Sequence, residues 1–186
     1  MGKVNWLLSE IWDLHQVMRN DIMRDYDRSL PFADELTDRW ERAKFLGFGE
    51  GSSVYDSVLV IGNVKVGKKT WVGPGCILDG SGGLEVGDYC SISSSSHIYS
   101  HSTVDWSLSG GKSPYKMAFT KVGNCCFLGS HSVIMEGVTI GNHCLIGANS
   151  LVNKDVYDFS FVAGNPAKVC GKVTVKSDGQ VEINES

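Results

Sequence analysis

Aliphatic residues recur at a fixed spacing of six toward the C-terminal end of this chain. The series consists of Val122, Leu128, Ile134, Ile140, Ile146 and Val152. A helix brings apolar residues round every three or four positions and a half-buried strand every two, so a spacing of six fits neither as a solitary element. Glycine directly follows four of these residues, and a compact residue such as Cys126 or Ser132 stands four positions after each of the first five. The pattern indicates a hexapeptide repeat.

Such a repeat predicts an all-β solenoid with three flat faces. Each hexad supplies a short strand with one aliphatic side chain turned inward and a turn into the next face, so three hexads close one turn of eighteen residues. The same phase continues upstream at Val60, Val66, Val72, Leu78, Val86, Ile92 and Ile98. We expect a coil from about Val58 to Val156 with roughly four to five turns.

Two interruptions break the repeat. The first adds two residues within Asp79–Gly83, and the second places a segment of about twenty residues between Tyr99 and Lys121. Because a stacked inner ladder cannot absorb extra residues, insertions in a solenoid leave it as loops. Functional residues concentrate on such loops, so the interruptions are where we expect the site.

The flanks predict three segments: a helical cap over 1–50, the coil domain over 51–172 with its loop over 99–121, and a C-terminal hairpin or tail over 173–186. Apolar residues at three- and four-residue steps predict an amphipathic helix from residue 4 to about 27. Alternating apolar residues on either side of Ser177-Asp178-Gly179 predict the hairpin.

A second helix is predicted from Phe32 to Leu46. Pro31 suits a helix start and Gly47 suits a C-terminal cap. Its buried stripe is expected to consist of Leu36, Trp40 and Ala43. Both helices are expected to cover the open end of the first turn.

Composition narrows the classes of function. A net charge of -4 gives no electrostatic reason for nucleic-acid binding. No apolar run reaches the roughly 20 residues that a membrane span needs, and Glu10 and Asp13 interrupt the first apolar stretch, so we expect no signal peptide and a cytoplasmic protein. Four of the six cysteines occupy compact hexad positions and no CxxC pair occurs, so we expect no metal.

Three motifs together resemble one family. They are the hexads, the loop entrance Ile98-Tyr99-Ser100-His101-Ser102 and the closing segment Ala163-Gly164-Asn165-Pro166-Ala167-Lys168. With these motifs the chain resembles the left-handed parallel β-helix acetyltransferases of the galactoside, maltose and lipopolysaccharide O-acetyltransferase type. The resemblance covers about residues 58 to 172. It implies a left-handed coil, a homotrimer with active sites between neighbouring subunits, and direct transfer of acetyl from acetyl-CoA to an acceptor.

The resemblance assigns the general base to His101. His97 is the competing histidine, but it is the last residue of its hexad, whereas His101 stands where the regular coil gives way to the loop. His131 and His143 lie in turns of regular hexads. Asp79 lies at the first interruption, about one turn before His101, where it would orient the imidazole, bind an acceptor hydroxyl or serve only as a turn residue.

Residues for the two substrates follow from the same comparison. By the resemblance, pantetheine is expected near Phe127, Ser130, Ala148 and Asn153, with Lys154, Lys168 and Lys172 for the phosphates and Gly129 or Ser130 for an oxyanion amide. In the loop, Trp106, Lys112 and Tyr115 combine aromatic faces with polar groups, which suits a sugar and equally a subunit interface.

The expected function is acetyl transfer from acetyl-CoA to a hydroxyl of a sugar or sugar nucleotide, by family inference in surface polysaccharide synthesis. Three alternatives stay open. They are N-acetylation of an amino sugar nucleotide, a zinc-dependent β-helix carbonic anhydrase that draws on His97, His101, His131 and His143, and a scaffold without catalysis.

Overall fold

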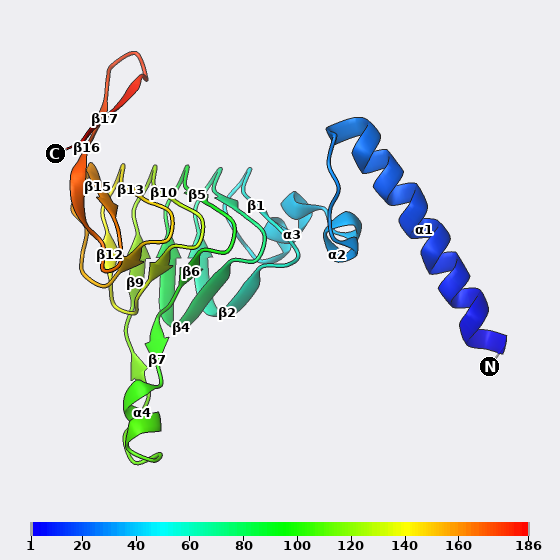
Figure 1. The fold of residues 1–186 in the computed structure, drawn as a ribbon, viewed down its shortest axis with the longest axis horizontal. Coiled ribbons are helices and arrows are strands. Elements are labelled where there is room, and N and C mark those ends of the chain that lie inside the picture. The colour runs from blue at the N-terminus through cyan, green and yellow to red at the C-terminus, as the bar shows by residue number, and fades with distance from the viewer. Residues whose placement is uncertain (1, 186) are drawn as a thin grey trace.

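The computed structural model describes residues 2–185, with side chains described for residues 4–185. The first residue of the predicted cap and the last residue of the predicted tail therefore lie outside the described residues. Figure 1 shows a coil of stacked short strands with a long helix at one end, a hairpin at the other and an arm that leaves the side of the coil.

The coil has three faces of parallel strands. The first face consists of β1 (Ser53–Val54), β3 (Trp71–Val72), β5 (Ser91–Ile92), β10 (Phe127–Leu128), β13 (Leu145–Ile146) and β15 (Ser160–Ala163). The second face consists of the first halves of β2 (Leu59–Val66) and β4 (Ile77–Val86), followed by β6 (His97–Ile98), β11 (Val133–Ile134) and β14 (Leu151–Val152). The third face consists of the second halves of β2 and β4, followed by β9 (Thr120–Val122) and β12 (Thr139–Ile140).

The coil is longer than the repeat predicted. Six strands of the described residues stack on the first face, which gives about six turns rather than four to five. The difference arises at both ends, because the coil already begins at Ser53 and continues through β15.

The inner ladder lies where the hexads place it. Leu78, Ile98, Leu128, Ile134 and Ile146 are 0% exposed. Val60, in the first turn, is only partly buried. Each fully buried side chain of this kind contributes roughly 1.5 to 3 kcal/mol, so the ladder is the main source of stability.

The first interruption is a bulge in β4. Strands β2 and β4 pair eighteen residues apart as far as Gly62 opposite Gly80, and twenty residues apart from Val64 opposite Leu84. The two extra residues therefore lie on the edge between the second and third faces. The inner ladder continues through Leu84, which is 1% exposed.

The second interruption forms the arm on that same edge. It consists of β7 (His101–Ser102), α4 (Val104–Leu108) and β8 (Lys116–Met117), and β7 and β8 pair as an antiparallel ribbon at its root. Figure 1 shows that the arm projects away from the coil.

The N-terminal segment differs from the prediction first in its second helix. Helix α1 (Gly2–Tyr26) matches the predicted first helix, but α2 (Phe32–Leu36) and α3 (Arg39–Phe45) replace the single second helix. The break occurs because the Asp38 side chain accepts hydrogen bonds from the backbone N–H groups of Trp40 and Glu41 and so begins a new helix.

The predicted buried stripe is wrong for two of its three residues. Ala43 is 1% exposed, whereas Leu36 and Trp40 are 50% and 49% exposed. The break after α2 changes the rotation of Leu36 and Trp40 relative to Ala43, so the three no longer share one face.

Helix α3 covers the first turn of the coil, and α1 does not. Arg42 of α3 donates hydrogen bonds to the carbonyl oxygens of Tyr55 and Val58, which fixes α3 on the coil. Helix α1 extends beyond it (Figure 1) and is joined to α2 by a 2.7 Å contact between His15 Nδ1 and the buried Glu35 carboxylate.

The C-terminal hairpin lengthens the first face. Strand β16 (Lys168–Val175) pairs antiparallel with β15 and with β17 (Val181–Glu185). Among residues 2–185, no helix combines the length and the hydropathy needed to cross a membrane.

The inner ladder generates the first prediction. Replacing Ile140, which is 1% exposed, by Asp places a charge with no partner in the middle of the stack, at a cost comparable with the whole stability of about 5 to 15 kcal/mol. We expect Ile140→Asp to abolish cooperative unfolding measured by circular dichroism, and Ile140→Val to cost about 0.5 to 1.5 kcal/mol.

The adjacent residue supplies the control. Thr139 is on the same strand and its side chain points outward and is exposed, so Thr139→Lys is expected to unfold with the wild type. An Ile140→Asp protein that melts at the wild-type temperature would contradict the role assigned to the ladder.

Candidate active site

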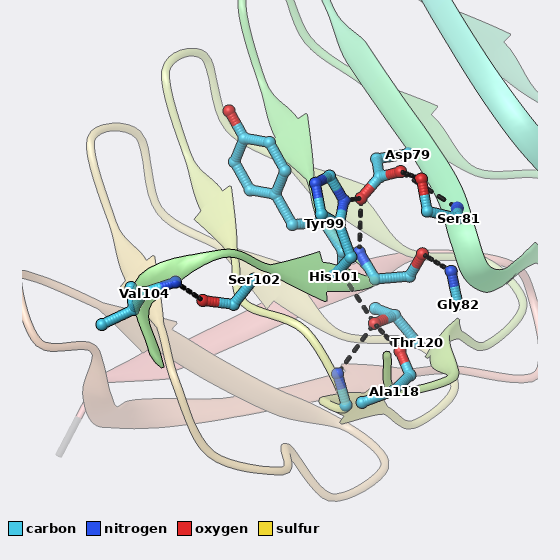
Figure 2. Close-up of polar contacts among 11 residues, drawn as sticks. Asp79, Ser81, Gly82, Tyr99, His101, Ser102, Val104, Ala118 and Thr120 are labelled. Carbon is cyan, nitrogen blue, oxygen red and sulfur yellow. Dashed lines mark hydrogen bonds and ion pairs between the residues drawn. The ribbon is translucent and has the colours of Figure 1, made fainter. Parts of the chain in front are cut away.

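The two interruptions of the repeat meet at one edge of the coil. Strands β4 and β6 are neighbours on the second face, with Leu78 opposite Ile98. Asp79 follows Leu78 just before the β4 bulge, and the chain after Ile98 runs into the arm, whose first residue is His101. Figure 2 shows the two side chains pointing toward each other.

Asp79 and His101 form a hydrogen-bonded pair. Oδ2 of Asp79 lies 2.5 Å from Nδ1 of His101 and also accepts a hydrogen bond of 3.0 Å from the backbone N–H of Ser100. Oδ1 accepts hydrogen bonds from the backbone N–H and the hydroxyl of Ser81, at 3.0 and 2.6 Å. Asp79 as a residue is 0% exposed, and every partner of its carboxylate is a hydrogen-bond donor.

These partners set the ionisation of Asp79. Burial alone raises the pKa of a carboxyl group, but the hydrogen bonds from Ser81, Ser100 and His101 outweigh it and lower the pKa of Asp79 to about 2. Asp79 is therefore an anion at neutral pH and only accepts hydrogen bonds. Nδ1 of His101 must then carry the proton of their shared hydrogen bond.

This tautomer leaves the other ring nitrogen of His101 as a base. With the proton on Nδ1, Nε2 of the neutral ring carries a lone pair. The His101 side chain is 30% exposed, so the ring remains accessible, whereas the Asp79 side chain is 1% exposed. A buried carboxylate that holds an accessible imidazole in one tautomer is an arrangement that supports proton abstraction.

A second set of hydrogen bonds fixes the root of the arm. The Ser100 hydroxyl accepts from the backbone N–H of Gly82, and the Ser100 carbonyl accepts from that of Ala118, at 2.8 and 2.9 Å. The Thr120 hydroxyl donates to the Tyr99 carbonyl and accepts from the N–H of Gly137. A Cβ at Gly82 would lie 2.2 Å from the Ser100 carbonyl oxygen. The bulge and the arm therefore fit together only without a side chain at Gly82.

The other histidines of the coil lack such a partner. His97 Nδ1 lies 3.3 Å from the Tyr99 hydroxyl, His131 is exposed in a turn, and the ring of His143 stacks on Phe159 at 4.8 Å. Among residues 4–185, no group of three His, Cys, Asp or Glu side chains is arranged to hold a metal ion.

The residues expected to bind coenzyme A do not converge on His101 within one chain. Ser130 precedes β11 and His101 follows β6, and because β6 and β11 pair, the two residues lie at opposite edges of the second face. Phe127 and Ala148 lie on the side of Ser130. Asn153 and Lys154 follow β14 and lie on the same edge as His101, but the turn of the coil that contains β11 separates these two residues from His101. Lys168 and Lys172 belong to β16.

Only one of the two amides suggested for an oxyanion is available. The N–H of Gly129 donates to the Ile146 carbonyl oxygen at 2.8 Å and is used in the coil. The N–H of Ser130 has no acceptor among the described residues. Of these two N–H groups, only that of Ser130 is free of a hydrogen bond within the described coil.

The arm carries the residues suggested for an acceptor. The rings of Trp106 and Tyr115 lie 5.6 Å apart at 54°, and the two side chains are 42% and 49% exposed. Lys112 is exposed between them in sequence. The neighbouring Lys116 pairs with Glu136 of the coil at 2.9 Å and joins the arm to the next turn.

Sequence reasoning missed Ser81 and Ser100. Ser81 stands two residues after Asp79, the spacing at which an aspartate side chain accepts from the backbone in a tight turn, so it carried a signal. Ser100 carried none, because its role depends on a register that places it beside Gly82.

The lowered pKa of Asp79 generates the second prediction. Because the pKa in the fold lies below its ordinary value of 3.8, ionised Asp79 stabilises the fold above about pH 4, and this contribution, about 2 kcal/mol, is lost as the pH falls toward 2. Asp79→Asn is expected to lower the free energy of unfolding at pH 7 by up to this amount and to flatten its decline in acid, measured by urea denaturation.

Asp105 offers a matched control. It is an exposed aspartate of the arm, and its carboxylate accepts no hydrogen bond from the described residues. Asp105→Asn is expected to leave stability unchanged at both pH values. Equal effects of the two substitutions would contradict the electrostatic role of Asp79.

Comparisons with known proteins agree with the repeat. Residues 119–154 match the family model described as bacterial transferase hexapeptide (six repeats). A segment of 53 residues is 45% identical to chloramphenicol acetyltransferase of Agrobacterium fabrum, and this segment is 28% of the present chain. The match spans only 25% of the length of that relative.

Solved structures share the fold over 66% to 86% of this chain. A galactoside acetyltransferase in complex with coenzyme A gives a TM-score of 0.65 at 23% identity, over 86% of this chain and 81% of that one. A mutant of AntD, an N-acyltransferase from Bacillus cereus, gives 0.60 at 20% identity over 71% and 88%. The acetyltransferase domain of PglB from Neisseria gonorrhoeae gives 0.53 at 21% identity over 66% and 50%.

The fold predicted from the hexads is thereby confirmed. The chain is a left-handed parallel β-helix with an N-terminal helical segment and a C-terminal hairpin, and its residues 119–154 carry the hexapeptide repeat of bacterial transferases.

Proposed function

We propose that this protein is an acetyl-CoA-dependent acetyltransferase that transfers acetyl directly to a hydroxyl of a sugar or sugar nucleotide, with His101 as the general base. The observation that carries the proposal is the 2.5 Å hydrogen bond from Nδ1 of His101 to the buried Asp79 carboxylate, which directs the lone pair of Nε2 away from Asp79.

The pair performs each proton transfer of such a reaction. Nε2 of His101 takes the proton of the acceptor hydroxyl as its oxygen attacks the thioester carbonyl carbon. The tetrahedral intermediate then collapses, the carbon–sulfur bond breaks, and the imidazolium returns its proton to the thiolate of coenzyme A. Asp79 stabilises the transient imidazolium and keeps the ring oriented.

The residues proposed for acetyl-CoA fit that group. The N–H of Ser130 lacks an acceptor among the described residues and suits a developing oxyanion. Lys154, Lys168 and Lys172 are exposed and form no ion pair among the described side chains, so they are available to phosphates. Related folds were solved with acetyl-CoA, coenzyme A and 3-hydroxybutyryl-CoA.

The separation of these groups supports assembly as a homotrimer. Ser130 and His101 lie at opposite edges of the second face, so one chain does not offer a thioester site beside its own base. A closed threefold arrangement of three-sided prisms brings the Ser130 edge of one chain to the His101 edge of the next. Each active site then lies between two subunits.

The acceptor is a sugar or sugar nucleotide, and the setting is surface polysaccharide synthesis in the cytoplasm, where acetyl-CoA is available. Trp106 and Tyr115 offer exposed aromatic faces for such an acceptor, and the same arm carries the exposed Lys112. One structure of AntD, an N-acyltransferase, contains dTDP-4-amino-4,6-dideoxyglucose and coenzyme A. Amino sugars therefore belong in any acceptor screen beside hydroxyl acceptors.

The third prediction tests the base. His101→Ala is expected to reduce turnover at least about a hundredfold, because loss of a general base typically costs 10² to 10⁴ in rate. The measurement is release of free coenzyme A thiol with a panel of nucleotide sugars and simple sugars. Circular dichroism verifies that the variant is folded, as expected for a side chain at the root of the arm.

His97→Ala is the matched control and is expected to cost much less, since His97 contacts a tyrosine hydroxyl rather than a carboxylate. A greater loss with His97→Ala would contradict the assignment. Stoichiometric zinc in the purified protein would favour the hydratase alternative. A melting temperature unchanged by coenzyme A at saturating concentration would favour a scaffold, because a ligand at 100 times its Kd adds about 2.7 kcal/mol.

A further inference from the structure

A groove near the N-terminal end of the coil gathers positive charge. It has a volume of about 780 Å³ and lies between the N-terminal segment and the first face. Its charged lining residues are Arg28, Arg39 and Lys69, and no Asp or Glu is among the described residues that line it. This local excess stands out in a chain with a net charge of -4.

The three cations are not neutralised by neighbouring carboxylates. None of them forms an ion pair among the described side chains. The acidic residues of α2 and the α3 cap bond to other groups. Asp34 accepts hydrogen bonds from Ser57, Glu35 contacts His15, and Asp38 caps α3. The positive charge of the groove is therefore available to an anion.

Arg39 is held in place by two aromatic rings. Its guanidinium carbon lies 4.2 Å from the centroid of the Trp40 ring and 5.3 Å from that of Tyr55. One of its NH₂ groups donates a 3.0 Å hydrogen bond to the Tyr55 hydroxyl. A guanidinium ordered in this way loses little entropy when its remaining N–H groups bind an oxyanion.

The groove also offers a flat apolar surface and hydroxyl groups. Trp71 lines the groove. Its side chain points outward from β3 and is 61% exposed. Five serines line the same groove, namely Ser53, Ser91, Ser93, Ser94 and Ser130. Ser93 and Ser94 belong to the run Ser93–Ser96. In this run the hexad pattern explains only Ser96, whose side chain points inward and is fully buried.

These features match the two halves of a nucleotide. Phosphate oxygens need cations and hydroxyl donors, and a base needs an aromatic face on which to stack. The volume is within the range of roughly 300 to 1,000 Å³ that small-molecule sites occupy. A carboxylate or inorganic anion alone would leave the exposed face of Trp71 without a function.

We propose that this groove binds the nucleoside diphosphate part of the acceptor, with the base on Trp71 and the diphosphate between Arg28, Arg39 and Lys69. The acceptor is then a nucleotide sugar rather than a free sugar. Its identity as the acceptor rests on the proposed acetyltransferase function, whereas nucleotide binding itself does not. Within one chain the groove, which Ser130 borders, and the Asp79–His101 pair lie on different edges of the coil. In the proposed trimer the Ser130 edge meets the His101 edge of the next subunit, so a nucleotide bound in the groove would direct its sugar toward that subunit's base.

Isothermal titration calorimetry of the full-length protein with UDP and dTDP tests the proposal. We expect Trp71→Ala, Arg28→Gln and Lys69→Asn each to weaken binding at least tenfold, and Trp71→Phe to retain most of it. Asn is chosen for Lys69 because that residue has a φ of +51°, which Asn tolerates. All three side chains are exposed, so folding is expected to survive, which thermal melting verifies.

Lys121→Gln is the control, because Lys121 is an exposed lysine of the third face that is remote from the groove and has no ion pair among the described side chains. It is expected to bind UDP as the wild type does. Binding of UDP by His101→Ala, with transfer lost, would support both proposals. Binding by the wild type with no transfer to any acceptor would support the groove and overturn the acetyltransferase function.

Four results would overturn the groove as an acceptor site. They are no binding of either nucleotide, binding that survives Trp71→Ala and Lys69→Asn, competition by inorganic phosphate as strong as that by UDP, and displacement of UDP by coenzyme A. The last result would assign the groove to the nucleotide of the acetyl donor instead.

Discussion

The inner ladder of aliphatic side chains is the constraint on which the rest of the structure depends. Each turn must place one apolar residue per face above that of the previous turn, as Leu78, Ile98 and Ile134 do on the second face. A residue added to one turn has no place inside, because the strand above fixes the register. It is forced outward to an edge, and the chain thereby acquires a loop at a position that the stack determines.

The geometry of the Asp79–His101 pair is a consequence of two such additions on adjacent turns. Asp79 still pairs regularly with Ile61 and lies just before the bulge in β4, and the arm begins at His101, where β7 pairs with β8 instead of continuing the coil. Neither insertion alone forms the pair. Because the turns are stacked at the fixed spacing of parallel strands, the two side chains come within hydrogen-bond distance without a flexible loop having to be ordered.

The sequence predicted what depends on periodicity and missed what depends on contacts across turns. The hexads predicted the buried positions from Val66 to Val152 and both interruptions, since each follows from spacing alone. The role of Asp79 stayed open, because its distance from His101 depends on how a two-residue bulge folds. Ser100 was missed for the same reason. The division of the second helix at Asp38 was missed because Pro31 and Gly47 marked only its outer ends, while an aspartate inside a helical pattern gives a weak signal.

The difference in charge between the His101 edge and the groove on the first face suggests how the proposed enzyme separates its two substrates. On the edge with His101, the buried Asp79 carboxylate accepts a hydrogen bond from the imidazole, and this arrangement suits proton transfer. The groove on the first face has the reverse composition, with cations and no acid among its described lining residues. Under the proposed function, two ligands that both carry phosphates are discriminated by position: the acceptor would bind where the N-terminal segment adds Arg28 and Arg39, and acetyl-CoA where the C-terminal strand adds Lys168 and Lys172. In the proposed trimer the reacting groups of the two ligands would meet between neighbouring subunits.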